Sequence, residues 1–348
     1  MKDVIKSEVK GAAQKWSRLL LVTFIGLLSI SFFLLLSCLG KPTIKKEVES
    51  SLGKGYNISY DISQLDDSKK HDFIRYGYDL FQNTSKYIGI GSKDKGNVYA
   101  GNSLSCNNCH LWSGTKTYAA PLVGVIQRFP QFRGRENKIG TIEERINGCM
   151  ERSMNGRTLP LESKEMKALL AYMNWLSRYA PEDGKIFGQG FVKINIPDRA
   201  VDLDKGKTVF EAKCVLCHAK DGQGLKSNVG YGYQYPPLWG KDSYNNGAGM
   251  TRVITAARFI KANMPYGVTY ENPILTDEEA YDVAGFINGQ SRPSKKNRER
   301  DFPDLKKKPV STPYPPYADT FSIRQHQIGP FLPIMEYYKS EYNIVKSK

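Results

Sequence analysis

The sequence predicts a mainly helical protein made of two similar halves in tandem, and three observations support this fold class. The motif Cys-x-x-Cys-His occurs twice, at residues 106–110 and 214–218. A segment with helical periodicity precedes each copy, since apolar residues recur three and four positions apart within residues 67–83 and 201–212. A second amphipathic segment follows each copy. Because the same order of features appears twice, we predict two tandem all-α domains and not one large fold.

The first helix of each half contains a glycine four residues before a phenylalanine. The two pairs are Gly77 with Phe81 and Gly206 with Phe210. A glycine on the apolar side of a helix has no side chain to hold a neighbouring helix away. We therefore expect another helix to cross closely at Gly77 and at Gly206.

The second helix of each half is expected at residues 163–177 and 276–287, where apolar residues again recur at helical spacing. The later segment opens with Thr-Asp-Glu-Glu at residues 276–279. A threonine followed by a glutamate three positions later is a capping box, which satisfies two free N–H groups at the start of a helix. Thr276 is therefore the expected N-cap of the last helix of the second half.

The repeated cysteine motif predicts the cofactor. Two thiols and an imidazole at this spacing can form thioether bonds to both vinyl groups of a haem and place the histidine on its iron. We therefore predict two covalently bound c-type haems, one in each half. Four of the six cysteines are used in this way, so a disulfide framework is excluded. Haem 1 is assigned to Cys106, Cys109 and His110, and haem 2 to Cys214, Cys217 and His218.

The second iron position of haem 2 is predicted from a loop. The order of helix, haem motif and helix resembles the single-haem class I cytochrome c fold, in which a loop supplies the distal ligand. Residues 263–267 (Asn-Met-Pro-Tyr-Gly) precede the last helix and resemble the Met-Pro-x-Gly ligand loop of that fold. The resemblance implies that Met264 completes the coordination of haem 2.

The distal ligand of haem 1 is harder to locate. Counting back from the second helix places the corresponding position of the first half near residue 151. Three side chains that contain sulfur surround this position, namely Cys149, Met150 and Met154. The pattern alone leans to Met154, because Asn-Gly follows it somewhat as Pro-Tyr-Gly follows the methionine of the second half, but it does not settle the choice.

A longer resemblance bears on this choice. Arg-Gly-Arg-Glu at residues 133–136 and the run at residues 145–157 resemble the dihaem thiosulfate dehydrogenases, which couple thiosulfate and tetrathionate. Residues 301–331 resemble the C-terminal extension of that family, so the similarity spans roughly residues 60 to 335. The resemblance implies that Cys149 is the distal ligand of a catalytic haem 1. It also implies that electrons pass from haem 1 to haem 2 and on to an external acceptor.

The substrate that this resemblance implies needs positive charge around it. Two thiosulfate dianions at about 4 Å in water repel each other by about 4 kcal/mol, four times the value for unit charges. Residues 128–157 contain seven Arg and Lys against four Glu, and guanidinium groups suit sulfonate oxygens as they suit phosphate. For any single arginine, a surface ion pair is the alternative. The catalytic residues that we expect are Cys149, Arg135 and Arg145, followed by Arg133 and Arg152.

Several points stay open at this stage. Some members of that family place a lysine beside the haem 2 methionine, where this chain has Asn263, so a ligand exchange at haem 2 is in doubt. The working direction, thiosulfate oxidation or tetrathionate reduction, is also open. One alternative is a non-catalytic, membrane-tethered dihaem cytochrome c that only transfers electrons. Another is a haem protein of the sulfur-oxidising multienzyme type, which needs a carrier-protein partner.

The N-terminal residues predict export. Residues 19–40 carry no charge and are long enough to span a bilayer, and Leu-Leu-Ser-Cys at residues 35–38 resembles a bacterial lipobox in which Cys38 is lipidated. We expect a signal anchor or lipoprotein signal, with the body on the periplasmic side of a bacterial membrane. The expected parts are residues 1–40 (signal), 41–65 (linker), 66–185 (domain 1, catalytic haem), 186–200 (linker), 201–292 (domain 2, electron-transfer haem) and 293–348 (C-terminal extension packing on both domains).

The composition agrees with two globular domains and with anionic partners. The chain has 348 residues, of which 40% are hydrophobic, and a formal net charge of +15. The sequence contains no recognisable nucleic-acid-binding module. The partners that we expect are thiosulfate and tetrathionate, a cytochrome c or similar redox protein, and the membrane through the N-terminal segment.

Overall fold

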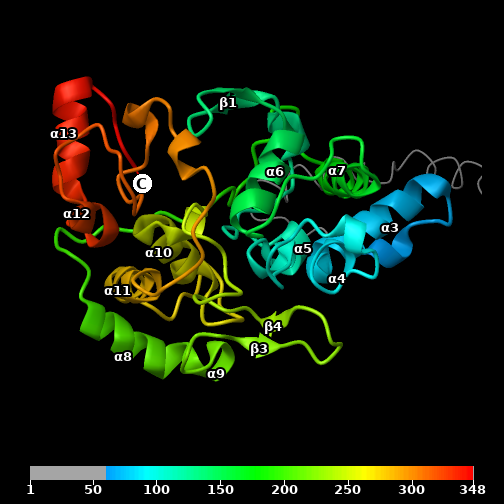
Figure 1. Ribbon diagram of the computed structural model, residues 1–348, viewed down its shortest axis with the longest axis horizontal. Helices are drawn as coiled ribbons and strands as arrows, with labels where there is room; N and C mark the ends of the chain where they lie inside the picture. The colour runs from blue at the N-terminus through cyan, green and yellow to red at the C-terminus, as the bar shows by residue number, and fades with distance from the viewer. Residues whose placement is uncertain (1–59, 348) are drawn as a thin grey trace, which may run out of the picture. The chain divides into compact units, whose positions relative to one another are not determined.

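The computed structural model describes residues 60–347 (Figure 1). The predictions for residues 1–40, including the fate of Cys38, and for most of the linker at residues 41–65 lie outside the described residues. Within residues 60–347, none of the helices combines the length and the hydropathy that crossing a membrane requires.

Two crossing helices form the centre of the first domain. Helix α3 (Lys69–Gln82) packs its buried face, which includes Phe81, against helix α7 (Lys164–Ser177). A Cβ atom added at Gly77 would lie 2.0 Å from the carbonyl oxygen of Ala168. The predicted close crossing at Gly77 is therefore confirmed, because any side chain there would push the two helices apart.

The second domain repeats this arrangement. Helix α8 (Leu203–Lys213) packs against helix α11 (Asp277–Asn288), which begins with the predicted capping box at Thr276. A Cβ atom added at Gly206 would lie 2.2 Å from the carbonyl oxygen of Asp282. The second close crossing is confirmed as well. Each half therefore uses a glycine at the equivalent position to bring its two helices together.

Further helices lie at or near the haem motifs and in the segments that follow them. In the first domain these are α4 (Thr84–Ile88), α5 (Leu111–Gly114) and α6 (Ile142–Arg152), and in the second they are α9 (Val215–His218) and α10 (Val253–Asn263). Single 3-10 turns lie at Ile62–Gln64, Lys95–Asn97, Cys106–Asn108, Ile126–Arg128, Gly249–Thr251, Arg298–Arg300 and Leu305–Lys307.

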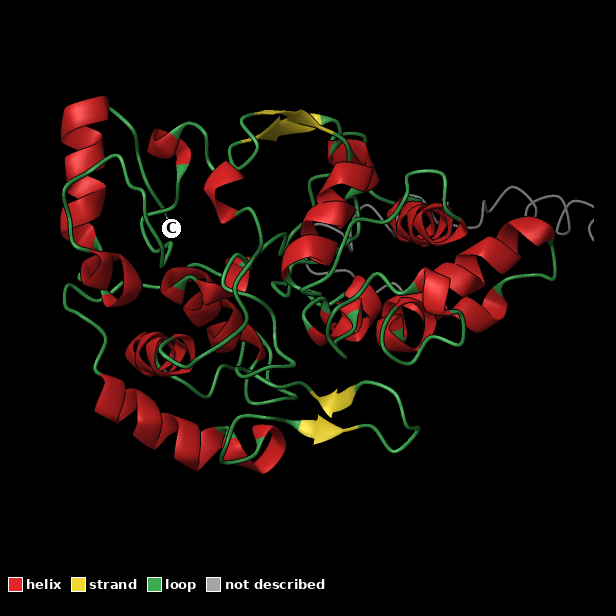
Figure 2. Cartoon of the chain, in the orientation of Figure 1, coloured by secondary structure: helices red, strands yellow, loops and turns green. Residues whose placement is uncertain are grey.

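The structure also contains two short antiparallel hairpins, drawn in yellow in Figure 2. One pairs β1 (Gln131–Arg133) with β2 (Lys138–Gly140), and the other pairs β3 (Leu225–Lys226) with β4 (Tyr233–Tyr235). The all-α prediction did not include them, because strands of two or three residues are too short to show an alternating pattern. The fold is therefore mainly helical, with two small hairpins in its loops.

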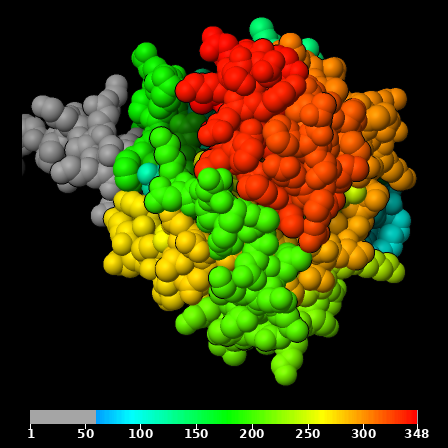
Figure 3. Space-filling view, turned by 90° about the vertical axis from the view of Figure 1, so that its left-hand side faces the viewer, coloured from blue at the N-terminus to red at the C-terminus, as the bar shows by residue number. Residues whose placement is uncertain are grey.

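The C-terminal residues beyond 292 carry helices α12 (Ile323–Ile328) and α13 (Leu332–Tyr342). Tyr338 of α13 is buried in the hydrophobic core of the second domain. The N–H of Phe302 donates a hydrogen bond to the carbonyl oxygen of Arg135 in the first domain, at 2.7 Å. The tail therefore contacts both domains. Figure 3 shows it in orange and red, covering much of the face turned toward the viewer.

Candidate active site

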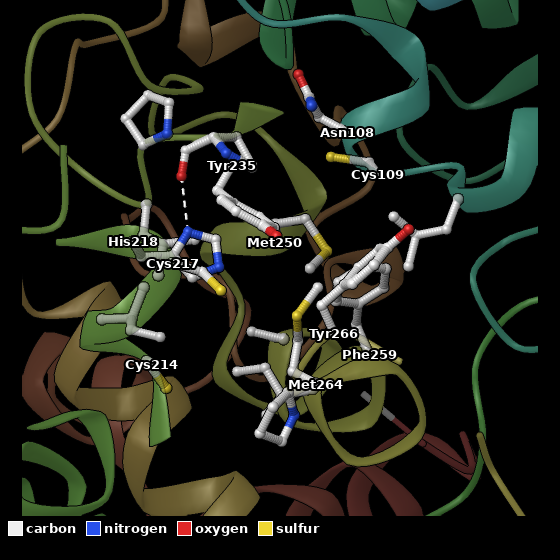
Figure 4. A pocket seen from close by; sticks show the side chains of 18 of the residues that line it. Asn108, Cys109, Cys214, Cys217, His218, Tyr235, Met250, Phe259, Met264 and Tyr266 are labelled. Carbon is white, nitrogen blue, oxygen red and sulfur yellow. Dashed lines mark hydrogen bonds between the residues drawn. The ribbon is translucent and has the colours of Figure 1, made fainter. Parts of the chain in front are cut away.

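The second haem motif opens onto a cavity of about 380 Å³. Its walls include Cys214 and Cys217, which would form the thioether bonds, together with His218 and Met264. Figure 4 shows the His218 ring and the Met264 thioether pointing into the same space. Most of the remaining wall is apolar, as a haem macrocycle requires. The residues of the second domain therefore fit a c-type haem.

A backbone carbonyl orients each motif histidine. Nδ1 of His218 lies 2.8 Å from the carbonyl oxygen of Pro236, and Nδ1 of His110 lies 2.7 Å from that of Ala120. Because a carbonyl oxygen can only accept, the proton is on Nδ1 in both rings. Nε2 then keeps the lone pair that an iron ligand needs. Both histidines are therefore held in the tautomer of a haem ligand.

Helix α6 brings Cys149 to the first haem motif. The Cys149 and His110 side chains lie close enough to interact, and Cys149 also acts electrostatically on Cys106 and Cys109. The predicted haem 1 attachment residues and Cys149 therefore surround one space. In the second half a loop carries the corresponding methionine, whereas here the sulfur comes from a helix.

Arg145 and Cys149 form the closest contact at this site. They lie four residues apart on α6, a spacing that places side chains on the same face of a helix. The Nη1 of Arg145 donates to the Cys149 Sγ at 2.8 Å. Burial by itself raises the pKa of the Cys149 thiol, but the charge of Arg145 and the contact with His110 lower it to about 6. Near neutral pH the cysteine is therefore largely a thiolate.

The two methionines near Cys149 pack into the protein interior. Met150 and Met154 are 2% and 3% exposed, and both belong to the hydrophobic core of the first domain. Their thioethers thus have a packing role in this structure. The sequence pattern by itself had leaned to Met154, without settling the choice.

The other three predicted arginines are bound by carboxylates. Arg133 donates from Nε and Nη2 to the two oxygens of Glu136, at 2.9 and 3.1 Å. Arg135 and Arg152 both donate to Asp301, at 2.7 and 2.6 Å. Only Arg145 of the four reaches the sulfur of Cys149 among the described contacts.

Asp301 is a central residue that sequence reasoning missed. It lies in the tail, 149 residues from Arg152, and no local pattern connects the two. Burial raises the pKa of Asp301, but the hydrogen bond from Arg152 and the charge of Arg135 lower it to about 2. Arg152 in turn donates to the carbonyl oxygen of Gly148 at 3.2 Å. The tail is therefore connected to the residue that precedes Cys149.

The two haem sites share a wall. Cys109 and Asn108 of the first haem motif also line the cavity of the second, as Figure 4 shows. Met250 lies between them and Met264 in the same view, and it packs against the cores of both domains. Asn263 donates to the carbonyl oxygens of Tyr118 and Phe259, at 3.1 and 2.9 Å. Direct contacts thus join the two halves where their haem sites meet.

Comparisons with known proteins agree with this organisation. Residues 97–181 match the family model described as "SoxA/TsdA, cytochrome c domain", and residues 203–291 match the one described as "Cytochrome c". Each matched segment contains one Cys-x-x-Cys-His motif. The chain therefore carries two c-type haems in tandem cytochrome c domains.

Three relatives identify the family. The thiosulfate dehydrogenase of Thiomonas intermedia is 41% identical over 72% of this chain and 76% of its own length, and that of Allochromatium vinosum is 44% identical over 56% and 72%. The solved thiosulfate dehydrogenase TsdBA from Marichromatium purpuratum, 34% identical, superposes with a TM-score of 0.60 over 68% of this chain and 49% of that longer one. The chain belongs to the thiosulfate dehydrogenase family.

Proposed function

We propose that this protein joins two thiosulfates into tetrathionate, 2 S₂O₃²⁻ → S₄O₆²⁻ + 2 e⁻, and can also run the reaction in reverse. The family assignment supports the reaction. The observation that carries the proposal for this chain is the contact of 2.8 Å between the Arg145 guanidinium and the Cys149 sulfur beside His110. A guanidinium and a thiolate in direct contact beside His110 suit an anionic sulfur substrate.

The proposed iron ligands are His110 and Cys149 for haem 1, and His218 and Met264 for haem 2. When bound, each haem would accept one electron at a time. A thiolate ligand stabilises ferric iron and lowers the reduction potential, whereas a methionine raises it. Electrons would then run downhill from the Cys149 side to the Met264 side, and on to a cytochrome c or similar acceptor. Cys109 of the first haem motif also lines the cavity of the second, which favours electron transfer between the two sites.

The chemical step assigns one role each to Cys149 and Arg145. Arg145 holds the sulfonate of the first thiosulfate, and the terminal sulfur of that thiosulfate joins the Cys149 sulfur in a new S–S bond with loss of two electrons. The terminal sulfur of a second thiosulfate then attacks the adduct sulfur that is bonded to the Cys149 Sγ, and the S–S bond to Cys149 breaks. The products are tetrathionate and the free Cys149 thiolate, so atoms and charge balance and no proton moves.

Bringing two dianions together requires further positive charge. We assign this role to Arg133, Arg135 and Arg152, which surround the start and end of α6 but share their charge with Glu136 and Asp301. These three guanidinium groups supply charge and hold α6 in place, while Arg145 contacts the sulfonate of the substrate directly. Of Arg135 and Arg145, which the sequence placed together in first rank, Arg145 is therefore the stronger candidate for contact with the substrate.

The cytochrome c domains indicate a location outside the cytoplasm. We further propose that the protein is held on the periplasmic side of a bacterial membrane, by residues 19–40 or by a lipidated Cys38. Labelling cells with a palmitate analogue tests the second possibility, since a Cys38→Ala variant should lose the label if the lipid is attached there.

The test of the proposed function is a Cys149→Gly variant. We expect it to keep both haems, counted as pyridine haemochromes, to lose the ferric thiolate signal in its EPR spectrum, and to lose turnover. Met154→Leu is the matched control, because it removes a nearby sulfur of similar size and should keep both the signal and the turnover. If Cys149→Gly turns over like the wild type, Cys149 has no chemical role. If the protein were a purely electron-transferring cytochrome with methionine on haem 1, Cys149→Gly would leave the EPR spectrum unchanged and Met154→Leu would alter it.

A further inference from the structure

A group of buried cations lies where the tail meets both domains. It comprises Arg135 and Arg152 of the first domain, Arg252 at the start of α10, and Lys295 and Lys308 of the tail. Arg252 is 8% exposed and Lys308 is 2% exposed. Burial lowers the pKa of Lys295, and it lowers that of Lys308 to about 8. We call these five residues the tail cluster.

Three carboxylates share the charge of these five cations: Asp301 makes the close contacts, while Glu136 and Glu151 lie 3.8 and 4.0 Å from Arg152. Asp301 accepts from Arg135 at 2.7 Å and from Arg152 at 2.6 Å, and the Lys295 Nζ lies 3.8 Å away. Lys308 donates to the carbonyl oxygen of Pro316 at 2.8 Å, which offers a dipole but no charge. The tail cluster therefore holds more positive charge than these three carboxylates can balance.

Arg252 has no carboxylate in hydrogen-bond contact among the described residues, although the charge of Asp301 acts on it. Among the residues that the structure describes, none accepts a hydrogen bond from its guanidinium, and its ring contact is with Phe302 at 5.8 Å. Burial, followed by repulsion from Arg135, lowers the pKa of Arg252 to about 9. A guanidinium nonetheless stays protonated in proteins. A buried cation in this position is costly unless an anion accompanies it.

Arg135, which lies near Arg252, has guanidinium nitrogens that do not donate to any acceptor among the described residues. Its Nη1 makes both of its hydrogen bonds, to Asp301 and to the carbonyl oxygen of Gly247, and within residues 60–347 neither Nε nor Nη2 meets an acceptor. Both guanidinium groups also face the ring of Phe302, at 5.0 and 5.8 Å. Arg252 is in addition the N-cap of α10, which has no side-chain cap, so the positive end of that helix adds to the field.

We propose that Arg252 and Arg135 bind a small, doubly charged, tetrahedral oxyanion between the two domains and the tail. Planar forks of this kind match the oxygens of a sulfate, a phosphate or the sulfonate end of a sulfur oxyanion. The site is centred on Arg252 and not on Cys149, whose charge partners are Arg145 and His110, although Arg135 adds charge to both regions. It depends on neither haem nor turnover, and it joins the tail to both domains.

The test is the affinity of the haem-loaded, ferric protein for sodium sulfate, measured by titration calorimetry at about 0.01 M ionic strength, where screening is weak. We expect Arg252→Gln to weaken sulfate binding by about tenfold or more, the loss of a hydrogen bond to a charged group. The matched control is Arg258→Gln, which removes the same charge from the same helix. Arg258 donates to the carbonyl oxygen of Ser347, outside the site, so its loss should leave the affinity unchanged.

Two further arms complete the experiment. Arg252→Lys should restore part of the affinity, and it guards against misfolding of the glutamine variant, which the haem absorbance and melting temperature also report. Cys149→Gly should bind sulfate like the wild type, so loss of turnover in that variant is separable from loss of this site. Titration with thiosulfate and tetrathionate distinguishes a sulfonate of the substrate from inorganic sulfate. If the wild type does not bind any of the three anions, or if Arg252→Gln binds sulfate as tightly as Arg258→Gln, the proposal is wrong.

Discussion

Asp301→Asn tests the connection between the tail and helix α6. The Asp301 side chain is 3% exposed and pairs with Arg135 and Arg152, so the amide keeps the shape but leaves two buried guanidinium groups without their anion. Removing one partner of a buried ion pair costs about 3–5 kcal/mol. At roughly 2–4 °C per kcal/mol for a chain of this size, the melting temperature should fall by about 6–20 °C at pH 7.

The effect should also depend on pH. The folded-state pKa of Asp301 is lowered to about 2, below the ordinary value of about 3.9. A lowered pKa gives stability that is fully present above about pH 4 and is lost as the pH falls toward 2, amounting to about 2–3 kcal/mol. The melting temperatures of the wild type and of Asp301→Asn should therefore converge between about pH 4 and pH 2.

Calorimetric melting of the haem-loaded proteins between pH 2 and 7 measures both effects. Asp304→Asn is the matched control, since Asp304 lies in the same tail but pairs with Lys307 near the surface, with 35% of its side chain exposed. Equal melting temperatures for the two variants at pH 7 would refute the central place given to Asp301.

The remaining predictions concern the active site, the helix crossing and the second haem. Arg145→Gln should lower kcat/KM for thiosulfate by about 10–100-fold with both haems retained, as expected for loss of a charge-assisted contact, and steady-state kinetics check this. An unchanged kcat/KM would remove Arg145 from the site. Gly77→Ala should lower the free energy of unfolding by about 1–3 kcal/mol, because its Cβ would meet the Ala168 carbonyl oxygen at 2.0 Å, whereas Gly249→Ala, with no atom within 4 Å, should cost far less in denaturant melts. Met264→Ala should keep its haem but lower one of the two reduction potentials in a spectroscopic titration. Two unchanged potentials would mean that another group binds that iron.

Much of the helical framework could be predicted because its signals are local. The glycines at 77 and 206, the capping box at Thr276 and the two cysteine motifs each occupy a few neighbouring residues. Close crossing follows from a missing side chain, and a helix start follows from two side chains three positions apart. The structure confirms these features where they were expected.

The active site could be predicted only in part, because its contacts join distant residues. The pairing of Asp301 with Arg152 spans 149 residues, and nothing in the tail marks this aspartate among its neighbours. Arg252 was not singled out from the sequence, and its contact with Phe302 of the tail joins residues 50 positions apart. The placement of Cys149 on a helix was likewise not visible, since counting from the second half pointed to a loop.

The central claim is tested most directly by anaerobic turnover of the haem-loaded protein. Thiosulfate loss is followed with ferricyanide as acceptor, and tetrathionate loss with a reduced viologen as donor. We predict that two thiosulfates disappear for each tetrathionate formed and each two ferricyanides reduced, and the ratio of the two rates gives the preferred direction. Absence of turnover in both assays, with two haems present by pyridine haemochrome, would contradict the account and leave an electron-transfer cytochrome in its place.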